Sequence, residues 1–426
     1  MTEIVILGGG VTGVTAGIVL QLLGFSTHIV CRHWLGDLDD SASASGDRHS
    51  PSDPRFASQY PAASIIPHTV HILNEQWHLQ SSQQIFETLQ VVPASGVRWQ
   101  RHFELFEVPA AVPAYAASLR NFRLINPSET IADGITIPRR CAEVHVDGWS
   151  FDALFAQMPL YRCFLARLYD DLGGRVSHRR FWTKDELLKL PGDTLINCAG
   201  AWGTGFWGDP EPSRFVQGTL VRIEAGSLPL AARLRIPVSY NYHPPPEVYS
   251  RPNGSTADVY FYPRDDAWLL GGTRLESDDL SAADTAPTDA LPAWHGETWN
   301  GAVVELPGSQ LGSASVCRVP EPIVSLNQIL IEQLTGIDIR NCPMNATFGY
   351  RHRRNTVRLE QQAWHDKHVL HNYGHGGAGV TLSWSTALQC AQWLQPGIAD
   401  RDVQCHVQSL LHRALKQFAS SPGLSG

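Results

Sequence analysis

The stretch IVILGGGVTG, residues 4–13, joins a continuous apolar run to a loop of the pattern Gly-x-Gly-x-x-Gly. Such an apolar run is typical of a parallel strand that is buried on both faces. Residues 14–23 are apolar nearly all round and predict a buried helix, which ends at Gly24, a residue that tolerates the left-handed conformation. Residues 26–30 predict a second strand. The sequence therefore predicts that the chain starts with a βαβ unit.

The size and charge of the chain favour a globular protein of two domains. Its 426 residues are too many for one simple core, and 43% of them are hydrophobic while 17% are charged. The formal net charge of −8 argues against nucleic acid or an anionic membrane as a partner, because an acidic chain repels phosphate. We find no secretory signal and no apolar run of roughly 20 residues, the length of a membrane span, so we expect a cytoplasmic protein.

The cysteines and histidines do not predict a metal site. The eight cysteines are scattered and form neither a Cys-x-x-Cys pair nor a zinc-like spacing. His375 could act as a metal ligand, but no second ligand stands at a suitable spacing from it. We therefore expect no metal, and free cysteines that behave as small buried hydrophobes in a reducing compartment.

The rest of the chain alternates helix-like and strand-like segments. Helices are predicted at residues 71–89, 151–172 and 381–394, and strands within 95–140 and at 193–200, 219–223, 258–262, 268–271 and just before the loop at 371–379. Residues 34–55 are small, acidic and rich in serine, which predicts a mobile surface loop or lid. Residues 276–297 are acidic and rich in alanine and proline, which predicts an exposed excursion.

The glycine pattern is typical of a loop that binds the pyrophosphate of a dinucleotide. Gly8 permits the tight turn, Gly10 lets the backbone approach the pyrophosphate, and Gly13 lets the helix pack close to the strand. The helix N-terminus at Val11 and Thr12 supplies favourable electrostatics for an anion. A dinucleotide is therefore the expected ligand, and the alternative is a glycine-rich turn of structural use only.

The end of the second predicted strand departs from the usual dinucleotide pattern. An acidic residue is expected there for the ribose hydroxyls, but Val30 is followed by Cys31, Arg32 and His33. Arg32 is compatible with the 2′-phosphate of NADP, and equally with a place near the adenosine of FAD. The first glycine loop alone does not decide between them.

A second glycine-rich loop near the end of the chain favours FAD. Residues 371–379 offer several backbone N–H groups in tight turns and lead into the helix predicted at 381–394. Two such loops can hold one extended cofactor from two sides, with the pyrophosphate at one loop and the flavin at the other. The alternative is an ordinary turn before a C-terminal helix.

Three segments resemble the D-amino-acid oxidase family of FAD enzymes. The sequence HNYGHGGAG at residues 371–379, with Thr381 and Trp384, is close to that family's C-terminal signature. Residues 195–202, LINCAGAW, resemble its strand that ends in Asn-Cys-x-Gly. Residues 349–360 resemble its Gly-x-Arg-x-x-Arg…Arg-Leu-Glu segment.

Weaker similarities to the same family occur elsewhere. Arg32 follows the second strand, where some members carry arginine. Phe-Ala-Ser at residues 56–58, with Pro67, is similar to a flavin-side segment, and Gln-Gly-Thr at residues 217–219 is similar to a crossover strand. The similarity covers most of the chain at wide spacing.

The resemblance implies an α/β fold in which a Rossmann-type FAD-binding domain is interleaved with an α+β substrate domain built on a mixed or antiparallel sheet. The FAD-binding domain is expected at residues 1–70, 141–210 and 341–400. The substrate domain is expected at 71–140 and 211–340, and a C-terminal helix and tail at 401–426.

The resemblance also assigns roles to residues. The residues expected to bind the cofactor are Gly8, Gly10, Val11, Thr12, Gly13, Arg32, Ala57, Ser58, Ala199, Gly200, Gly374, Gly376, Gly377, Gly379, Val380 and Thr381. Arg351 is expected to bind the substrate carboxylate through its planar guanidinium, and Tyr260 to close on the same carboxylate. The backbone at Gly377 and Ala378 is expected to face the substrate.

The sequence departs from the family at several positions near the expected substrate. Thr256 stands where a second pocket tyrosine is often found, and Tyr262 is the nearest substitute. Tyr60, Ile65 and His68 occupy a segment where members place other residues. The sequence therefore does not determine the identity of the substrate, and an ordinary D-amino acid is one of several alternatives.

The family's chemistry implies oxidation of a D-amino acid or a related amine-bearing carboxylate. A hydride moves from the substrate Cα to flavin N5, no catalytic acid or base side chain is required, O2 reoxidises the flavin to give H2O2, and the imine hydrolyses. A secondary amine or a natural-product intermediate is an alternative substrate. A dicarboxylate such as D-aspartate is a further alternative, because Arg353 and Arg354 stand beside Arg351 and could bind a second carboxylate.

Two readings of other kinds also stay open. One is an NADP-dependent dehydrogenase that uses Arg32, and the other is a flavin-bearing protein without turnover. The expected partners are a small amine or amino-acid substrate and O2, and a homodimer is left open.

Overall fold

The computed structural model describes residues 3–37, 53–59, 63–66, 71–229, 238–281, 284–285, 294–308, 316–395 and 400–420. Most of the loop predicted at 34–55 lies outside the described residues, and so do Tyr60, Pro67 and His68. Among the described helices, none is long and apolar enough to cross a membrane.

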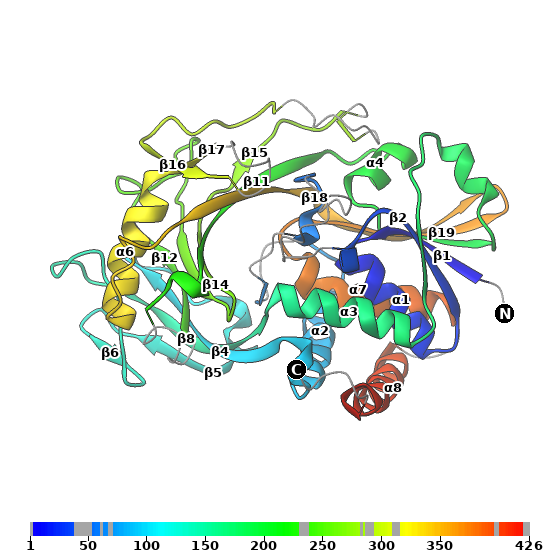
Figure 1. Cartoon of the computed structure of the whole chain (residues 1–426), viewed down its shortest axis with the longest axis horizontal. Coiled ribbons are helices and arrows are strands. Elements are labelled where there is room, and N and C mark those ends of the chain that lie inside the picture. The colour runs from blue at the N-terminus through cyan, green and yellow to red at the C-terminus, as the bar shows by residue number, and fades with distance from the viewer. Residues whose placement is uncertain are drawn as a thin grey trace.

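The helices and strands keep the labels of Figure 1. The helices are α1 (Val11–Leu22), α2 (Glu75–Leu89), α3 (Met158–Asp171), α4 (Ala201–Trp207), α6 (Glu321–Thr335), α7 (Gly379–Leu394) and α8 (Asp400–Ser420). The strands before residue 200 are β1 (Glu3–Gly9), β2 (Ser26–Trp34), β3 (Ser64–Ile65), β4 (Val97–Phe106), β5 (Arg120–Ile125), β6 (Ile131–Ala132), β7 (Ile135–Thr136), β8 (Asp147–Ala156), β9 (Arg175–His178) and β10 (Thr194–Asn197). The later strands are β11 (Ser213–Glu224), β12 (Val238–His243), β13 (Val259–Pro263), β14 (Ala267–Gly271), β15 (Leu275–Glu276), β16 (Val303–Pro307), β17 (Val316–Pro320), β18 (Asn345–Trp364) and β19 (Lys367–His375).

One half of the molecule is a parallel sheet covered by helices. Its strands follow the order β19-β10-β1-β2-β9, and each neighbouring pair in this order is parallel. The side chains of Val5 and Ile6 in β1 are fully buried, as expected of a strand with both faces covered. Helix α1 packs against α3 and α7 beside this sheet (Figure 1). This arrangement confirms the predicted Rossmann-type unit at the start of the chain.

The other half is a mixed sheet in the order β3-β8-β4-β12-β13-β14-β11-β18. Its pairs are antiparallel except for β4 with β12. Residues alternate between the two faces along each strand. Phe103, Leu105, Tyr240 and Phe261 point to one face and form an apolar core with α6. The opposite face is the more polar one, and it faces the parallel half.

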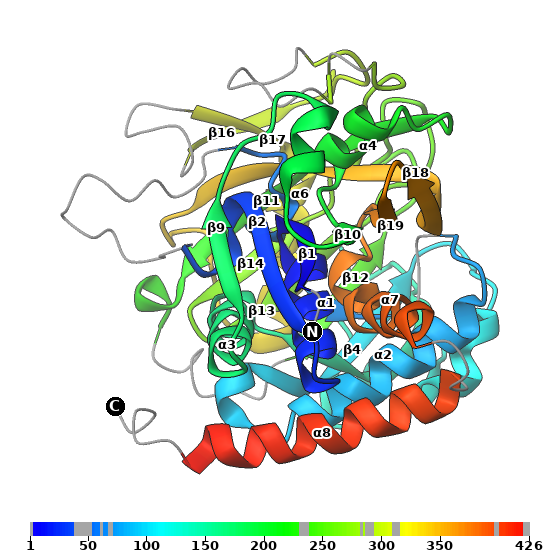
Figure 2. The same cartoon turned by 90° about the vertical axis from the view of Figure 1, so that its right-hand side faces the viewer.

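The 20-residue strand β18 connects the two halves. Its first part, residues 345–354, pairs with β11 of the mixed sheet, and residues 358–364 pair with β19 of the parallel sheet. Figure 1 shows this strand crossing the middle of the molecule, and Figure 2 shows α8 running along the base beneath α2 and α7. The two halves therefore share one continuous sheet and cannot move apart without breaking β18.

The structure corrects the helix predicted at residues 151–172. Residues up to Ala156 belong to strand β8, which pairs with β4, and the helix begins only at Met158. Pro159 stands in the first turn, a favoured position for proline that marks the true start. Cross-strand pairing to residues distant in sequence decides the conformation of residues 151–156, and a helical spacing of apolar residues could not reveal it.

Two predictions of exposure or burial are also corrected. In the described part of residues 276–297, Thr285 is 2% exposed and Trp294 stacks on Tyr350, so this segment partly covers the protein. The eight cysteines are all free thiols, but Cys163 and Cys405 are exposed. The predicted division of the chain into domains at given residues stays a prediction.

The turn from β1 into α1 is built on glycines that no other residue could replace without movement. Gly8 has φ of +106°, and a Cβ on Gly13 would lie 2.0 Å from the Gly8 carbonyl oxygen. The third glycine of the pattern thus permits the close approach of helix and strand that the sequence predicts.

We expect Gly13→Ala to lower the free energy of unfolding by about 1–3 kcal/mol, because the added methyl group must push backbone apart. The same shift moves the N-terminus of α1, so retention of a bound dinucleotide should also fall. Chemical denaturation and the visible absorbance of the purified protein measure the two effects. Gly226→Ala is the matched control, since nothing lies within 4 Å of its Cβ position. Equal behaviour of the two variants would contradict the role given to Gly13.

Candidate cofactor and substrate site

A cavity of about 1160 Å³ lies at the carboxyl ends of the parallel strands. This is where open α/β sheets bind their ligands. It contains most of the residues expected to bind the cofactor, namely Gly8, Gly10, Val11, Thr12, Arg32, Ala57, Ser58, Ala199, Gly200, Gly374, Gly376 and Gly379. Gly13 lies beneath the loop and packs on Gly8, outside the lining.

This cavity continues into the mixed half of the molecule. A space of about 560 Å³ follows, between Val11 and Arg351, and then a larger one of about 1460 Å³ above the mixed sheet. Gly376 lines all three spaces. Gly377 and Val380 line the second and third, and Thr381 lines the third. The second glycine loop therefore stands at the junction, as expected if it meets the reactive end of an extended cofactor.

The first cavity offers both backbone and side-chain groups to a dinucleotide. A Cβ on Gly10 would lie only 2.8 Å from Ser58 Oγ, so the absence of a side chain lets the two segments approach closely. The Val11 N–H donates a hydrogen bond of 3.0 Å to the same Ser58 oxygen. His33 Nε2, Trp202 Nε1 and His375 Nε2 line this cavity and are buried without a hydrogen-bond partner among the described residues. Buried polar atoms of this kind usually bind something. The residues present therefore fit a long ligand that carries polar groups.

Arg32 lies on the cavity wall beside an acidic residue that the sequence analysis missed. Asp53 is 7% exposed, forms a bond of 2.9 Å with the Arg55 guanidinium, and lies 3.9 Å from Arg32. Burial opposes ionisation of Asp53, but the Arg55 hydrogen bonds and charge lower its pKa overall. The last residues of the predicted mobile loop 34–55 are therefore buried. The serine-rich composition of the preceding residues predicts a surface loop, so it gives no sign of this buried ion pair.

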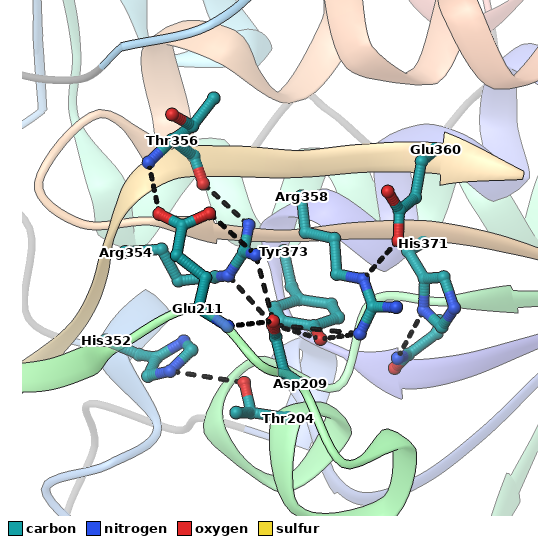
Figure 3. Close-up of polar contacts among 11 residues, drawn as sticks. Thr204, Asp209, Glu211, His352, Arg354, Thr356, Arg358, Glu360, His371 and Tyr373 are labelled. Atoms are coloured by element: carbon teal, nitrogen blue, oxygen red, sulfur yellow. Dashed lines mark hydrogen bonds and ion pairs between the residues drawn. The ribbon is translucent and has the colours of Figure 1, made fainter.

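A buried charge network fixes the strands behind the cofactor cavity (Figure 3). Asp209 Oδ2 lies 2.8 Å from Arg354 Nε and 3.7 Å from Arg358 Nη1, and it accepts a hydrogen bond of 2.7 Å from Tyr373. The Asp209 side chain is 0% exposed. Burial opposes its ionisation, but the bond from Tyr373 and the nearby guanidinium of Arg354 lower its pKa. Tyr373 lines the cofactor cavity, so the network holds one wall of that cavity.

This network corrects the suggestion that Arg353 and Arg354 select a dicarboxylate. Arg354 bonds to Asp209 and, at 2.9 Å, to Glu211, and it does not line the substrate cavity. Arg353 does line it, but its guanidinium is paired with Glu276 at 2.7 Å. Of the arginines in this run, Arg351 and Arg353 line the cavity, and Arg351 has no carboxylate partner among the described residues.

Arg351 and Tyr260 meet in the space above the mixed sheet. Burial lowers the pKa of Arg351 and raises that of Tyr260, and the positive charge of Arg351 partly offsets the effect of burial on Tyr260. Each lies across a glycine: a Cβ on Gly218 would come within 2.6 Å of Arg351 Nη2, and one on Gly271 within 2.2 Å of the Tyr260 ring. These glycines form a flat floor on β11 and β14. Their role was not predicted, although the Gln-Gly-Thr segment pointed to Gly218.

Some of the residues at which the sequence departs from the family line this space, and others do not. Ala378 and Gly377 line it, as does Tyr262, the suggested substitute for a second tyrosine. Thr256 is exposed and lies outside the lining. Ile65 is buried in β3, while its neighbours Ser64 and Ile66 line the space. Among the described residues, no group of histidine, cysteine and acidic side chains could hold a metal ion.

The charges around this space leave an excess of positive charge. Arg274 pairs with Asp258 at 3.2 Å, and Arg353 pairs with Glu276. Arg351 and Arg251 also line it, and neither has a carboxylate partner among the described residues. Burying a guanidinium without an anion is costly, so the space suits an anionic ligand.

Two buried histidines of β19 make the stability of this region depend on pH. Burial lowers the pKa of His371 and of His375 from 6.5 to about 3, with charge repulsion from Arg358 and from His78 as the next causes. The unfolded chain therefore binds more protons below pH 6.5, and stability is lost as pH falls from there towards about 3.

We expect a loss of roughly 1.4 kcal/mol per pH unit for each of these histidines over that window. His375→Gln should remove one such contribution and flatten the pH dependence below pH 6.5 relative to the wild type. Urea unfolding at a series of pH values measures this. His412→Gln, at an exposed position on α8, is the control. An unchanged slope in His375→Gln would show that His375 titrates normally.

Comparison with known sequences is consistent with this geometry. The family model described as "FAD dependent oxidoreductase" (DAO) matches residues 3–393. A D-amino-acid oxidase of Rubrobacter xylanophilus is 25% identical over 391 residues, which cover 91% of this chain and 94% of that protein. A D-aspartate oxidase of Homo sapiens is 23% identical over 354 residues, covering 80% and 83%.

Solved structures share the fold over nearly the whole chain. A glycine oxidase from Geobacillus kaustophilus has a TM-score of 0.57 at 14% identity and covers 93% of this chain and 95% of its own. An L-α-glycerophosphate oxidase from Mycoplasma pneumoniae with FAD bound has a TM-score of 0.58 at 12% identity, with the same coverage of 93% and 95%. Because the matching family model is that of an FAD-dependent oxidoreductase, FAD is the cofactor, in place of the NADP alternative. The chain belongs to the DAO family of FAD-dependent oxidoreductases.

Proposed function

We propose that this enzyme oxidises a free D-amino acid, or a closely similar amine-bearing carboxylate, to the imine, with O2 as electron acceptor. The observation that carries the proposal is the Arg351–Tyr260 pair in a cavity that joins the cofactor cavity at Gly376. The names of the relatives, D-amino-acid oxidase and D-aspartate oxidase, support the substrate class and the acceptor.

The chain's own residues would position the substrate. The Arg351 guanidinium can make two parallel bonds to a carboxylate, and the Tyr260 hydroxyl can add a third. The glycine floor beneath them leaves both side chains little freedom. Two-point attachment of the carboxylate then fixes where the substrate Cα lies relative to Gly376.

Bound FAD supplies the redox chemistry by accepting the hydride from the substrate Cα. The protein's part is orientation and exclusion of water, which together can contribute roughly 7 kcal/mol or more. We identify no side chain in the cavity as a catalytic acid or base. The proposal therefore assigns the rate to positioning of the substrate by Arg351 and Tyr260.

The test of the proposal is anaerobic addition of D- and L-amino acids to the purified yellow protein. We expect D-amino acids to bleach the flavin and L-amino acids to leave it oxidised. Readmission of air should then restore the colour and release H2O2. A flavin that no D-amino acid bleaches would overturn the proposed substrate class, and bleaching without reoxidation by air would overturn O2 as acceptor.

Arg351→Leu should raise the KM for D-amino acids by 100-fold or more, corresponding to loss of about 2.7 kcal/mol of charge-assisted hydrogen bonding, while the flavin stays bound. Steady-state kinetics and the visible spectrum measure the two. Arg214→Gln is the matched control, because Arg214 lies on the neighbouring strand, is paired with Glu276 and Asp279, and is outside the cavity lining. Loss of flavin in Arg351→Leu would instead assign Arg351 to the cofactor.

An acidic D-amino acid is a second candidate, favoured by Arg251. This arginine lines the same cavity and has no carboxylate partner among the described residues, so it can meet a second anionic group. Because Arg351 and Arg251 are separate side chains of the cavity wall, a substrate with two carboxylates would neutralise both.

Arg251→Gln should then lower kcat/KM for D-aspartate or D-glutamate by about tenfold or more, since a charged hydrogen bond contributes about 1.5–3 kcal/mol. The value for D-alanine should change less than twofold. Parallel kinetics on the three substrates measure the effect. An equal loss on acidic and neutral substrates would reject the second candidate and leave the first.

A further inference from the structure

One wall of the substrate cavity carries a chain of hydrogen bonds that ends on a buried carboxylate. Ser64 Oγ donates to the Tyr262 hydroxyl at 3.3 Å, and Tyr262 donates to Asn241 Oδ1 at 3.0 Å. Asn241 Nδ2 then donates to Glu104 Oε1 at 2.7 Å. Ser64, Asn241 and Tyr262 line the cavity, whereas Glu104 lies behind them. The Tyr262 hydroxyl therefore lies between two other residues that line the cavity.

Sheet geometry places these groups together. Glu104 of β4 is in register with Asn241 of β12, and Asn241 is in register with Tyr260 of β13. Residues in register across a sheet point to the same face. Tyr262 lies two residues beyond Tyr260 and shares that face. The carboxylate is thus built into the same polar face as the proposed substrate clamp.

Glu104 accepts hydrogen bonds from three side chains. Besides Asn241, His102 Nε2 lies 3.3 Å from Oε1 and His243 Nε2 lies 3.2 Å from Oε2. Burial opposes ionisation of Glu104, but the hydrogen bonds from His102 and His243 lower its pKa well below its usual range. The side chain is 9% exposed. Glu104 is therefore a carboxylate that can only accept.

An acceptor at one end fixes the direction of every bond in the chain. Asn241 must turn its NH2 group towards Glu104, so its oxygen faces Tyr262. Tyr262 must then use its single proton on that oxygen. The Tyr262 hydroxyl accepts one hydrogen bond from Ser64. Its remaining hydrogen-bonding group is a lone pair, which can accept a hydrogen bond from a ligand in the cavity.

We propose that Glu104 is a positioning residue that makes Tyr262 a hydrogen-bond acceptor towards the substrate, and that the enzyme thereby prefers substrates with an N–H or O–H at this wall. The proposal rests on the proposed function, since it takes this cavity to be the substrate site. An amine, ammonium or side-chain hydroxyl satisfies the lone pair. A methyl group in the same place buries it unpaired, which is unfavourable.

Binding of rigid carboxylates tests this without turnover, because benzoates have no Cα–H to transfer. The ortho, meta and para aminobenzoates each offer an N–H donor, and the matching methylbenzoates have nearly the same shape without it. Titration calorimetry with the FAD-loaded enzyme gives the Kd of each. At the ring position that reaches the wall, we expect the amino ligand to bind about five- to tenfold tighter than the methyl ligand.

Glu104→Gln should bring this ratio close to one, because a glutamine can donate as well as accept and the chain can then reverse. Tyr262→Phe should abolish the preference too, and provides a second route if Glu104→Gln binds FAD poorly. Glu107→Gln is the matched control. Glu107 accepts from Tyr242 and Arg140 and does not line the cavity, so its replacement should leave the ratio unchanged.

The outcomes separate the two proposals. If the wild type binds these carboxylates with no amino preference at any position, or if Glu104→Gln keeps the preference, the role of Glu104 is overturned and the proposed function stands. If the wild type binds none of the six ligands, both are overturned.

Discussion

The carboxylate of Asp209 stabilises the geometry on which both cavities depend. It holds Arg354 and Arg358 of β18 and Tyr373 of β19 at one buried point. Between those arginines the register of β18 against β19 is interrupted. The network thus secures the strand where it passes from one sheet to the other. Arg351 stands just before that crossing, and Gly376, whose N–H donates to His352 of β18, lies just after the end of β19. Removing one member of such a network leaves buried charges unpaired, which is more costly than the pair is favourable.

The second organising feature is the difference between the two faces of the mixed sheet. Successive residues of β4, β12 and β13 have opposite environments. Phe103, Tyr240 and Phe261 belong to the apolar core with α6. On the other face, Asn241 lines the substrate cavity and Glu104 lies behind it. A half-buried antiparallel sheet with a polar cavity above it needs this alternation. Specificity can therefore change on one face while the core on the other face is retained.

The parts that the sequence predicted well are those in which local pattern and backbone conformation coincide. The loop at residues 8–13 has the turn, the close packing and the helix N-terminus that its glycines predict, and the loop at 371–379 lies where the cavities join. Contacts between distant residues were not predictable in the same way. Nothing in the residues around Gly218 shows that Arg351 will lie on it, because they are joined only by the register of β11 and β18. Asp53 is buried within a segment whose composition predicts a surface loop. Residues 151–156 have the apolar spacing of a helix, but they form a strand because they pair with β4, which is remote in sequence.

The strand order has a consequence for how the chain folds as it is synthesised. One of the two neighbours of β1, at residues 3–9, is β10 at residues 194–197, and β10 in turn needs β19 at residues 367–375. Until β19 has left the ribosome, β10 keeps an unpaired edge, and β18 cannot join the two halves. Long-range parallel pairing is slow, and unpaired edges invite aggregation. The nascent chain is therefore expected to depend on chaperones until β19 has been made, and a messenger truncated before the codons of β19 would give an insoluble product and not a partly active one.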